Sequence, residues 1–492
     1  MTAASATQGR ALQIARTAAI GVVLGAELAP PLANLAAAVM LVAFFFIPDW
    51  RARARVITTS HLALGVAVFC IALLLAAVVG ALNPQGAGSA LAHLLGWRTL
   101  GLLLIAFAVF DTEAAKRRFA IAFIVLTAIA AAVSLIGTEW GAQIGALRPG
   151  FALGNAFNAP VRYGIVALLV ATLCVALYAA FDPECSGSRI VRVFALFAIV
   201  SAILLLIRVR LATEIQDPNP GVVLRNTVTQ AMAFGIAAFF AGLLIIHPRT
   251  RPPWQRLLLG AVTLLLLGQL VFLQVGRSGQ VMFAILVLVA ALRALRGSQR
   301  VLAVAAVPAL AAVAFVLSPL MQSRFETAWR EVAHAASAAD YTSMGIRVVM
   351  WQNSVELVRA RPLLGYGLGG VEPAYAALVK DRESGWKATV TGDPHNQFLA
   401  LWIEGGLVGL LAFLFFLSRV ATQPAPEPWR SVALALLAAW CATSMVSSHF
   451  QTFNEGHLIV LFLGVFLAPV LAHGADRQVA ASAPVTAAAT SA

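Results

Sequence analysis

A chain of 492 residues that is 61% hydrophobic and only 11% charged is too apolar for a soluble domain, in which about half of the residues are apolar and about a quarter are charged. Its net charge of +13 indicates membrane topology and contact with anionic lipid rather than nucleic acid, because no aromatic-basic motif accompanies it. The four cysteines form no CxxC pair, so they indicate neither a disulfide framework nor a thiolate metal site.

Apolar segments of about 20 residues, each long enough to cross roughly 30 Å of hydrocarbon, recur along most of the chain. They predict an all-α polytopic membrane protein with 12–14 transmembrane helices. The segment from Gln8 to Ala26 is apolar enough to remain as a first span rather than a cleaved signal peptide. The first two segments are short and are separated by Pro30 and Pro31, so a re-entrant pair is the alternative there. The predicted spans are 11–28, 32–47, 61–82, 92–110, 118–137, 160–181, 190–207, 225–247, 254–275, 279–296, 300–320, 397–418, 430–449 and 454–472.

The lysines and arginines of alternate loops set the expected orientation. One set of loops, together with both termini, carries 19 of them, whereas the opposite short loops carry seven. The richer side is expected to be cytoplasmic, so that both termini lie inside the cell. The richer set contains Arg10, Arg16, Arg51, Arg53, Arg55, Lys116, Arg117, Arg118, Arg189, Arg192, Arg249, Arg251, Arg256, Arg293, Arg296, Arg300, Arg419, Arg430 and Arg477.

Seven arginines lie on the other, outward side, at or just inside predicted helix ends. A charge near hydrocarbon is costly unless it snorkels or finds a partner, and outside the polar loop only Glu139, Glu214 and Asp217 are obvious acidic partners. A bound anion would supply the missing charge, and guanidinium matches phosphate with two parallel hydrogen bonds. The alternative is that each arginine reaches lipid phosphates. The seven are Arg98, Arg148, Arg162, Arg208, Arg210, Arg225 and Arg277.

Arg277 stands in the turn Gly276-Arg277-Ser278-Gly279, between two apolar segments. Glycines in such a turn would let the backbone approach a ligand closely and would leave N–H groups free for an anion. We expect the turn to face outward.

A polar loop spans 321–396 and holds 16 charges in 76 residues, far above the chain average. Its apolar spacing predicts one helix from Gln322 to Ala336 and a second from Ser343 to Arg361, ended by Pro362. Four glycines follow between 365 and 370, and such a run suits a tight backbone path near a ligand. We expect the loop to form an extracytoplasmic head that carries catalytic groups to the membrane surface.

The polar loop ends in Gly392-Asp393-Pro394-His395-Asn396-Gln397, which runs directly into an apolar segment. Asp393 is expected to cap the next helix and Pro394 to take its first position, which places His395 in the first turn. A helix N-terminus disfavours imidazolium and attracts anions, so His395 should be neutral near pH 7, beside a phosphate site. A neutral base there suits glycosyl transfer from a lipid pyrophosphate. The alternative is a structural histidine bonded to a loop carbonyl.

The remaining histidines give no sign of a metal site. His334, His449 and His457 are not at ligand spacing with His395, and neither DxD nor HExxH occurs. We therefore expect a site that uses no metal and no other cofactor. The histidines near predicted membrane boundaries are expected to be structural: His61, His93, His247 and His473.

Three motifs give the chain a family resemblance. His395-Asn396, nine residues, Gly406, two residues and Gly409 match the pattern H-[NSQ]-x9-G-x-x-[GTY] of the O-antigen ligases. Gly345-Ile346-Arg347 with Trp351 and residues 362–369, and the turn around Arg277, resemble segments shared across the wider superfamily. Over about 255–470 the chain thus resembles the WaaL-type O-antigen ligases, whose superfamily includes Wzy polymerases and PglL-type O-oligosaccharyltransferases. Residues 154–160 resemble the family's G-x-F-x-N-P loop, although Ala159-Pro160 replaces its Pro-Asn pair.

The resemblance implies a GT-C-like membrane glycosyltransferase fold. It also implies transfer of a polysaccharide from undecaprenyl pyrophosphate to a hydroxyl of lipid A–core oligosaccharide, at the periplasmic face of the bacterial inner membrane. By position, His395 is the expected base, and Arg277 and Arg347 are the expected pyrophosphate contacts. Further expected substrate contacts are Arg162, Arg208, Arg210, Asn155, Asn158, Tyr163, Asn396 and Tyr366.

The expected organisation has four parts: N-terminal transmembrane helices over 1–320, a periplasmic catalytic loop over 321–396, C-terminal transmembrane helices over 397–472 and a disordered cytoplasmic tail over 473–492. One alternative function is an O-antigen polymerase or O-linked protein oligosaccharyltransferase, which would use the same donor with another acceptor. A transporter is the other alternative. It is disfavoured because the polar groups gather at one face and no convincing inverted repeat is visible.

Overall fold

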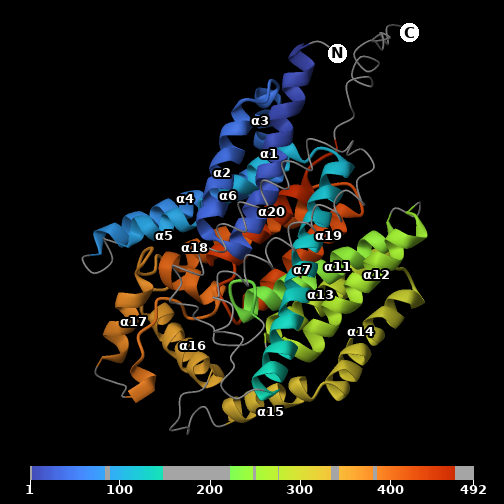
Figure 1. Cartoon of the computed structure of the whole chain (residues 1–492). Coiled ribbons are helices and arrows are strands. Elements are labelled where there is room, and N and C mark those ends of the chain that lie inside the picture. The colour runs from blue at the N-terminus through green and yellow to red at the C-terminus, as the bar shows by residue number, and fades with distance from the viewer. Residues whose placement is uncertain are drawn as a thin grey trace, which may run out of the picture.

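The computed structural model describes residues 3–83, 89–147, 222–247, 251–274, 276–333, 343–380 and 385–470. Within these ranges the regular structure is entirely helical, as Figure 1 shows. The elements are α1 (Ala3–Leu28), α2 (Pro30–Phe45), α3 (Trp50–Thr58), α4 (His61–Leu82), α5 (Ala90–Gly96), α6 (Thr99–Val109), α7 (Glu113–Leu147), α11 (Thr227–Ile246), α12 (Pro253–Gly268) with the short π-helix η1 (Gln269–Leu273), α13 (Arg277–Ala294), α14 (Ser298–Leu317), α15 (Pro319–Ala333), α16 (Ser343–Ala360), α17 (Val371–Val379), the 3₁₀ turn η2 (Gly385–Ala388), α18 (Gln397–Thr422), α19 (Trp429–Thr443) and α20 (Phe453–Leu467).

The protein is an all-α polytopic membrane protein. In the described ranges eight helical segments are long and apolar enough to cross a membrane, or nine if the bent pair α2–α3 is one span. The bent pair, with an angle of 107°, is α2 and α3. The first two predicted segments, for which a re-entrant pair was the alternative, are the separate helices α1 and α2, joined at Ala29. The predicted spans 160–181 and 190–207 lie outside the described residues.

Helix α14 has the composition and exposure expected of a helix that faces lipid. It is 20 residues long and none of its residues is buried, although it is among the more apolar segments of the chain. A helix that is apolar on all sides and unburied would be insoluble in water and suits hydrocarbon.

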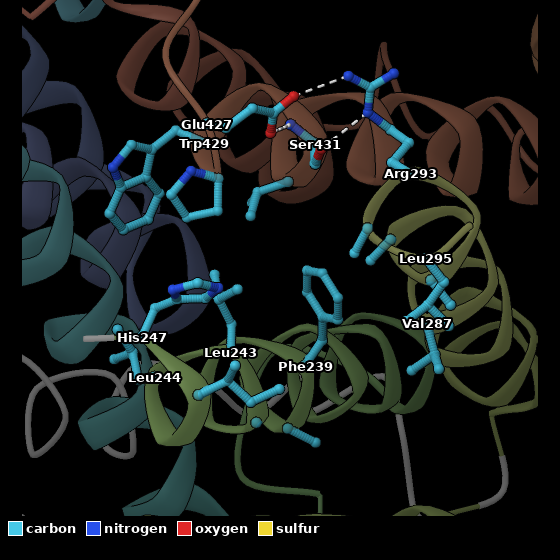
Figure 2. Close-up of a pocket in the computed structure, with 18 of the residues that line it drawn as sticks. Phe239, Leu243, Leu244, His247, Val287, Arg293, Leu295, Glu427, Trp429 and Ser431 are labelled. Carbon is cyan, nitrogen blue, oxygen red and sulfur yellow. Dashed lines mark hydrogen bonds and ion pairs between the residues drawn. The ribbon is translucent and has the colours of Figure 1, made fainter. Parts of the chain in front are cut away.

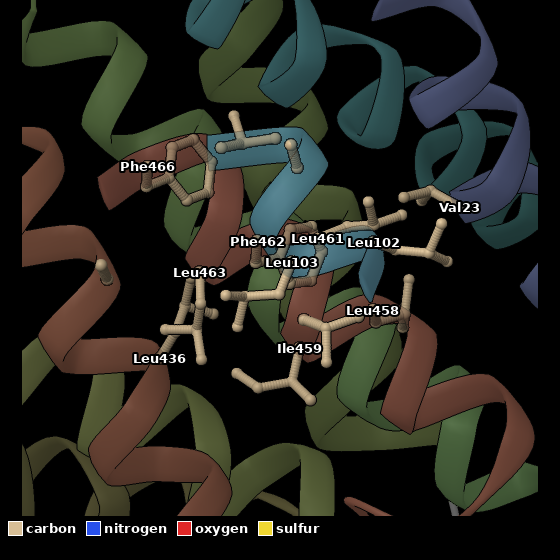
Figure 3. Close-up of a cluster of buried hydrophobic side chains, with 14 of the residues drawn as sticks. Val23, Leu102, Leu103, Leu436, Leu458, Ile459, Leu461, Phe462, Leu463 and Phe466 are labelled. Carbon is tan, nitrogen blue, oxygen red and sulfur yellow. The ribbon is translucent and has the colours of Figure 1, made fainter. Parts of the chain in front are cut away.

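The core of the bundle surrounds α20, which Figure 3 shows packed among neighbouring helices. Every residue of α20 from Asn454 to Leu467 is buried. Phe462 and Phe466 meet the rings of Phe119, Phe123 and Phe240 from α7 and α11. Because it is buried on all sides, α20 lies inside the bundle. With 15 residues it is about 22 Å long at 1.5 Å per residue, which is shorter than a full membrane span.

Buried charges gather where α1, α3 and α7 meet. Arg16 and Arg53 both bind the carboxylate of Asp111, the second at 2.9 Å. Lys116 donates to the carbonyl oxygens of Phe466 and Ala468 at the end of α20. Part of the basic set that the sequence assigned to loops is therefore an internal ion-pair network at one end of the bundle.

The polar loop forms a helical head, and α15, α16 and α17 lie along the lower side of the view in Figure 1, away from the start of α1. The helix predicted from Ser343 to Arg361 is α16, and the one predicted from Gln322 to Ala336 is α15, shifted to Pro319–Ala333. The head has its own apolar cluster, which includes one residue of α18: Ile346, Met350, Leu357, Val358, Val371, Ala374, Tyr375, Val379 and Ile403. The head is thereby packed onto the first turns of α18.

Candidate functional site

His395 lies in a short connection between the head and α18, and local hydrogen bonds fix its backbone. Its N–H donates to Asp393 Oδ1 at 2.8 Å, and Asp393 N–H donates to Thr391 Oγ1 at 3.1 Å. His395 has a φ of 51°, the one positive φ among the described residues other than glycine. A left-handed backbone costs free energy at such a residue and is concentrated at functional sites.

The start of α18 differs from the expectation. Asn396 is the N-cap, and its Oδ1 accepts the N–H groups of Phe398 at 3.0 Å and Leu399 at 3.1 Å. The prediction that Asp393 caps this helix, with His395 in its first turn, was wrong, because the Asp393 carboxylate instead holds the His395 N–H. His395 therefore precedes the cap, and the side-chain oxygen of Asn396 is used by the helix.

A second loop, residues 444–452 between α19 and α20, forms a wall of the site. Gln397 N–H donates to Ser444 O at 2.9 Å, and Phe450 N–H donates to Gln397 Oε1 at 3.1 Å. Ser448 Oγ donates to Asp393 Oδ1 at 2.6 Å. These bonds join segments some 50 residues apart in the sequence and place His449 next to the His395 connection.

The electrostatics of the site favour a neutral His395. Burial lowers the pKa of His395 below its usual value, and the positive charge of Arg347, on α16, lowers it further, whereas the Asp393 carboxylate raises it. The direction agrees with the sequence-based expectation, but burial is the largest cause rather than the helix terminus.

The Asp393 carboxylate also lies on one particular side of the imidazole. Asp393 Oδ2 is 3.7 Å from His395 Nδ1, too far for a hydrogen bond. The negative charge still favours a proton on Nδ1, which leaves Nε2 to accept one.

The glycine motif that follows His395 breaks α18. Gly406 has φ 62° and ψ −164° inside the helix, and a Cβ there would lie 2.1 Å from Leu363 O. At this break the loop from Pro362 to Leu368 replaces the lost helical bonds. Leu407 N–H donates to Pro362 O at 2.8 Å, and Tyr366 N–H donates to Ile403 O at 2.8 Å.

The glycine run of the polar loop therefore serves packing. Gly365, Gly367 and Gly369 all have positive φ, and a Cβ on them would meet, respectively, Ile403 O of α18, Gly80 N of α4 and Ser89 Oγ. Its close neighbours among the described residues are α4, α18 and the turn before α5, and the expectation that it passes close to a ligand stays a prediction. These close contacts pack the head tightly against α4 and α18, next to the candidate site.

The Arg277 turn also owes its glycines to packing. Arg277 is the first residue of α13, after the N-cap Gly276. A Cβ at Gly276 would lie 2.6 Å from Thr227 O, and one at Gly279 would lie 2.1 Å from Ala231 O. Small residues thus let α13 cross α11 closely, and the expected approach of a ligand to this turn stays a prediction. The crossing sets Arg277 at the start of α13, half-buried.

The other predicted contacts fall into two groups. Tyr366 is half-buried in the head, and its ring lies under the Arg361 guanidinium at 4.7 Å. The rest lie outside the described residues: Arg162, Arg208, Arg210, Asn155, Asn158 and Tyr163.

In the described residues no group of three or more His, Cys, Asp or Glu side chains could hold a metal ion.

A cavity of about 920 Å³ lies between α11, α13 and α19, and Figure 2 shows its apolar lining and the Arg293–Glu427 ion pair at 2.9 Å on its rim. Its lining comes from α7, α11, α12, α13 and residues 427–432, and it includes none of residues 391–397 or 444–452, which form the candidate site. This cavity is therefore separate from the candidate site.

Sequence reasoning missed two buried polar residues here. His449 was set aside for lack of metal-ligand spacing, yet the fold brings it beside His395. Glu404, 2% exposed, accepts from Gly369 N–H at 3.2 Å and from Gln451 Nε2 at 3.2 Å, and lies 3.0 Å from His93 Nδ1. The polar run from 447 to 457 between two apolar segments was the available signal for His449, and a lone acid inside a predicted span was the signal for Glu404.

Comparison with known proteins agrees with the motifs. Residues 261–414 match a family model described as O-antigen ligase, a range that includes Arg277, Arg347, His395, Gly406 and Gly409. A Haemophilus influenzae protein, described as an uncharacterized protein, is 32% identical over 76 residues, which are 15% of this chain and 19% of that relative. The expected resemblance is confirmed: residues 261–414 are similar to the O-antigen ligase family.

Proposed function

We propose that the protein is an O-antigen ligase. It transfers polysaccharide from undecaprenyl pyrophosphate to a hydroxyl of lipid A–core oligosaccharide, at the periplasmic face of the bacterial inner membrane. The observation that carries the proposal is a half-buried histidine whose left-handed backbone is held by Asp393, within electrostatic range of Arg347 on the head, at the junction with the bundle and within the family match.

The chemistry needs one base and a group that offsets negative charge. His395 Nε2 takes the proton of the acceptor hydroxyl as its oxygen bonds to the anomeric carbon of the donor sugar. The bond from that carbon to the pyrophosphate oxygen breaks, and undecaprenyl pyrophosphate leaves. Arg347, with Arg277, offsets the charge that grows on the leaving group. Asp393 holds the His395 backbone and stabilises the imidazolium that forms.

The position of the site suits two lipid substrates. The head packs on the first turns of α18, so His395 lies where a transmembrane helix begins and can meet head groups held by the bilayer. The reaction as proposed has no step that uses a metal or a nucleotide.

A polymerase or an O-linked protein oligosaccharyltransferase would use the same donor and the same base, so the acceptor decides. The test is purified protein in proteoliposomes with lipid-linked O-antigen and, separately, lipid A–core, a second lipid-linked chain or an acceptor protein. We expect polysaccharide on lipid A–core, formed equally well in EDTA. Product only on one of the other two acceptors would contradict the ligase assignment, and loss of product in EDTA would contradict the metal-free chemistry.

A further inference from the structure

His449, in the loop between α19 and α20, is a buried imidazole that the chemistry above does not use. It is 1% exposed, and neither Nδ1 nor Nε2 has a hydrogen-bond partner among the described residues. Buried polar atoms in proteins nearly always have a partner, because burial without one costs free energy. A buried imidazole at a candidate site whose two ring nitrogens lack partners is suited to form hydrogen bonds with a ligand.

The surroundings place this imidazole inside the site. Its loop is bonded to the His395 connection through Ser448 and Phe450. Burial lowers the pKa of His449, while the charges of Glu455 and Asp393 raise it and those of Arg347 and His395 lower it. The ring is therefore within electrostatic range of the proposed base and the proposed phosphate contact. When neutral, it offers one hydrogen-bond donor and one acceptor.

The first turn of α20, which follows the loop of His449, carries buried acceptor oxygens. Asn454 is 3% exposed and its Oδ1 has no partner among the described residues. Glu455 accepts the Thr229 hydroxyl at 2.5 Å. Glu27, on α1, is fully buried with both carboxyl oxygens unpartnered in the described part of the chain, and its carboxyl group is within electrostatic range of Glu455.

This composition selects one ligand chemistry. The charge of Glu455 repels phosphate, whereas carboxyl and amide oxygens accept hydrogen bonds from hydroxyl groups. Arg347, the group suited to phosphate, belongs to the head on α16, whereas the acceptor oxygens belong to α20 and α1. We propose that His449 and Asn454, backed by Glu455 and Glu27, form a sugar-hydroxyl subsite beside His395.

The subsite deepens the proposed function and rests on it, because a sugar must lie next to the base for transfer to occur. Two sugars meet there: the acceptor sugar of lipid A–core and the first sugar of the lipid-linked donor. Both present hydroxyl groups of the same chemistry, so kinetics must assign the subsite to one of them.

The test compares His449→Ala, His449→Gln and Asn454→Ala with wild type in proteoliposomes, measuring KM for each substrate and kcat. Loss of one hydrogen bond should raise KM for one sugar substrate by about 3- to 10-fold. Glutamine, which keeps a donor and an acceptor, should restore part of the loss. The control is His61→Gln, whose ring contacts Thr422 O at 3.1 Å at the far end of α18, and it should be silent.

A higher KM for lipid A–core assigns the subsite to the acceptor, and a higher KM for the lipid-linked donor assigns it to the donor sugar. Unchanged kinetics in all three variants would overturn the proposal. A lower kcat with both KM values unchanged would also overturn it, since His449 would then act on the chemistry and not on sugar binding.

Binding without transfer separates this proposal from the ligase assignment. Wild type and His449→Ala are titrated in detergent with lipid A–core and with undecaprenyl pyrophosphate that carries no sugar. We expect the variant to bind the sugar-free lipid as wild type does. Weaker binding of that lipid would show an anion site and overturn the subsite, whereas wild type that binds both lipids without transferring would contradict the proposed function alone.

Discussion

At the scale of single residues, the site is defined by how His395 is held. Its left-handed backbone is kept in place by Asp393, which accepts both the His395 N–H and the Ser448 hydroxyl. That carboxylate could not also cap α18, so Asn396 does. The sequence analysis named only Asp393 as the cap, because the contact of its carboxylate with Ser448, 55 residues further along the chain, forms only in the folded protein.

The pH dependence of transfer should follow the neutral fraction of His395. Because its pKa is lowered, the base stays neutral down to a pH under the ordinary value of about 6.5, and kcat/KM should fall only below that. Asp393→Asn removes a charge that raises the pKa, so the acidic limb should move to lower pH. Arg347→Gln removes a charge that lowers it, so the limb should move to higher pH. Limbs that move in the same direction, or not at all, would disprove the assignment of the base.

Arg347 should matter through its charge and its shape. Arg347→Ala should lower kcat/KM by about 10- to 100-fold, the loss expected for a hydrogen bond to a charged group. Lysine should rescue only in part, because a point charge cannot replace the guanidinium fork. Arg330→Ala is the control, since Arg330 lies on the same head but is exposed and paired with Glu326. Equal effects at the two positions would mean that Arg347 contributes only to the general charge of the head.

At the scale of elements, the helices were largely predictable and the joints between them were not. Apolar spacing and Pro362 placed α16 within one residue of its observed end. The break of α18 at Gly406 was not predicted, nor were the hydrogen bonds that residues 362–368 make to α18 at the break. Those hydrogen bonds join two segments that meet only in the folded chain. His449 was missed for the same reason, since its loop meets His395 only in the folded chain.

The two glycines of the motif should respond differently to alanine. Gly406→Ala forces a side chain into a backbone region that is essentially restricted to glycine, which alone costs about 1–3 kcal/mol, and its Cβ would overlap Leu363 O at 2.1 Å. Gly409→Ala meets only Leu401 O at 3.4 Å and should be neutral. Thermal unfolding in detergent should show a clear drop in Tm for Gly406→Ala alone. Matching Tm values would contradict the reading of Gly406 as the helix break.

At the scale of the whole molecule, the charge bias agrees with where the ends of the helices lie. Arg117, Arg293 and Glu427 line one cavity, so three loops that the sequence assigned to one side do meet at one end of the bundle. The head lies at the other end (Figure 1). Which end faces the cytoplasm stays a prediction, as do the GT-C-like fold and the total of 12–14 spans.

Thiol labelling tests that orientation. In a variant whose four native cysteines are replaced, Thr389→Cys in the head should react in whole cells with an impermeant maleimide once the outer membrane is opened. Arg55→Cys, exposed on α3, should react only after the inner membrane is opened. The reverse order of labelling would invert the topology and move the site away from periplasmic substrates.

The most direct test of the central claim is the turnover of His395→Gln in proteoliposomes that contain lipid-linked O-antigen and lipid A–core. Glutamine can keep a hydrogen bond but cannot take the proton. We predict that transfer falls by about 10²- to 10⁴-fold, the contribution of a general base, while the variant binds the lipid-linked donor as wild type does. Turnover near that of wild type would show that His395 only positions a substrate and that the proposed base is wrong.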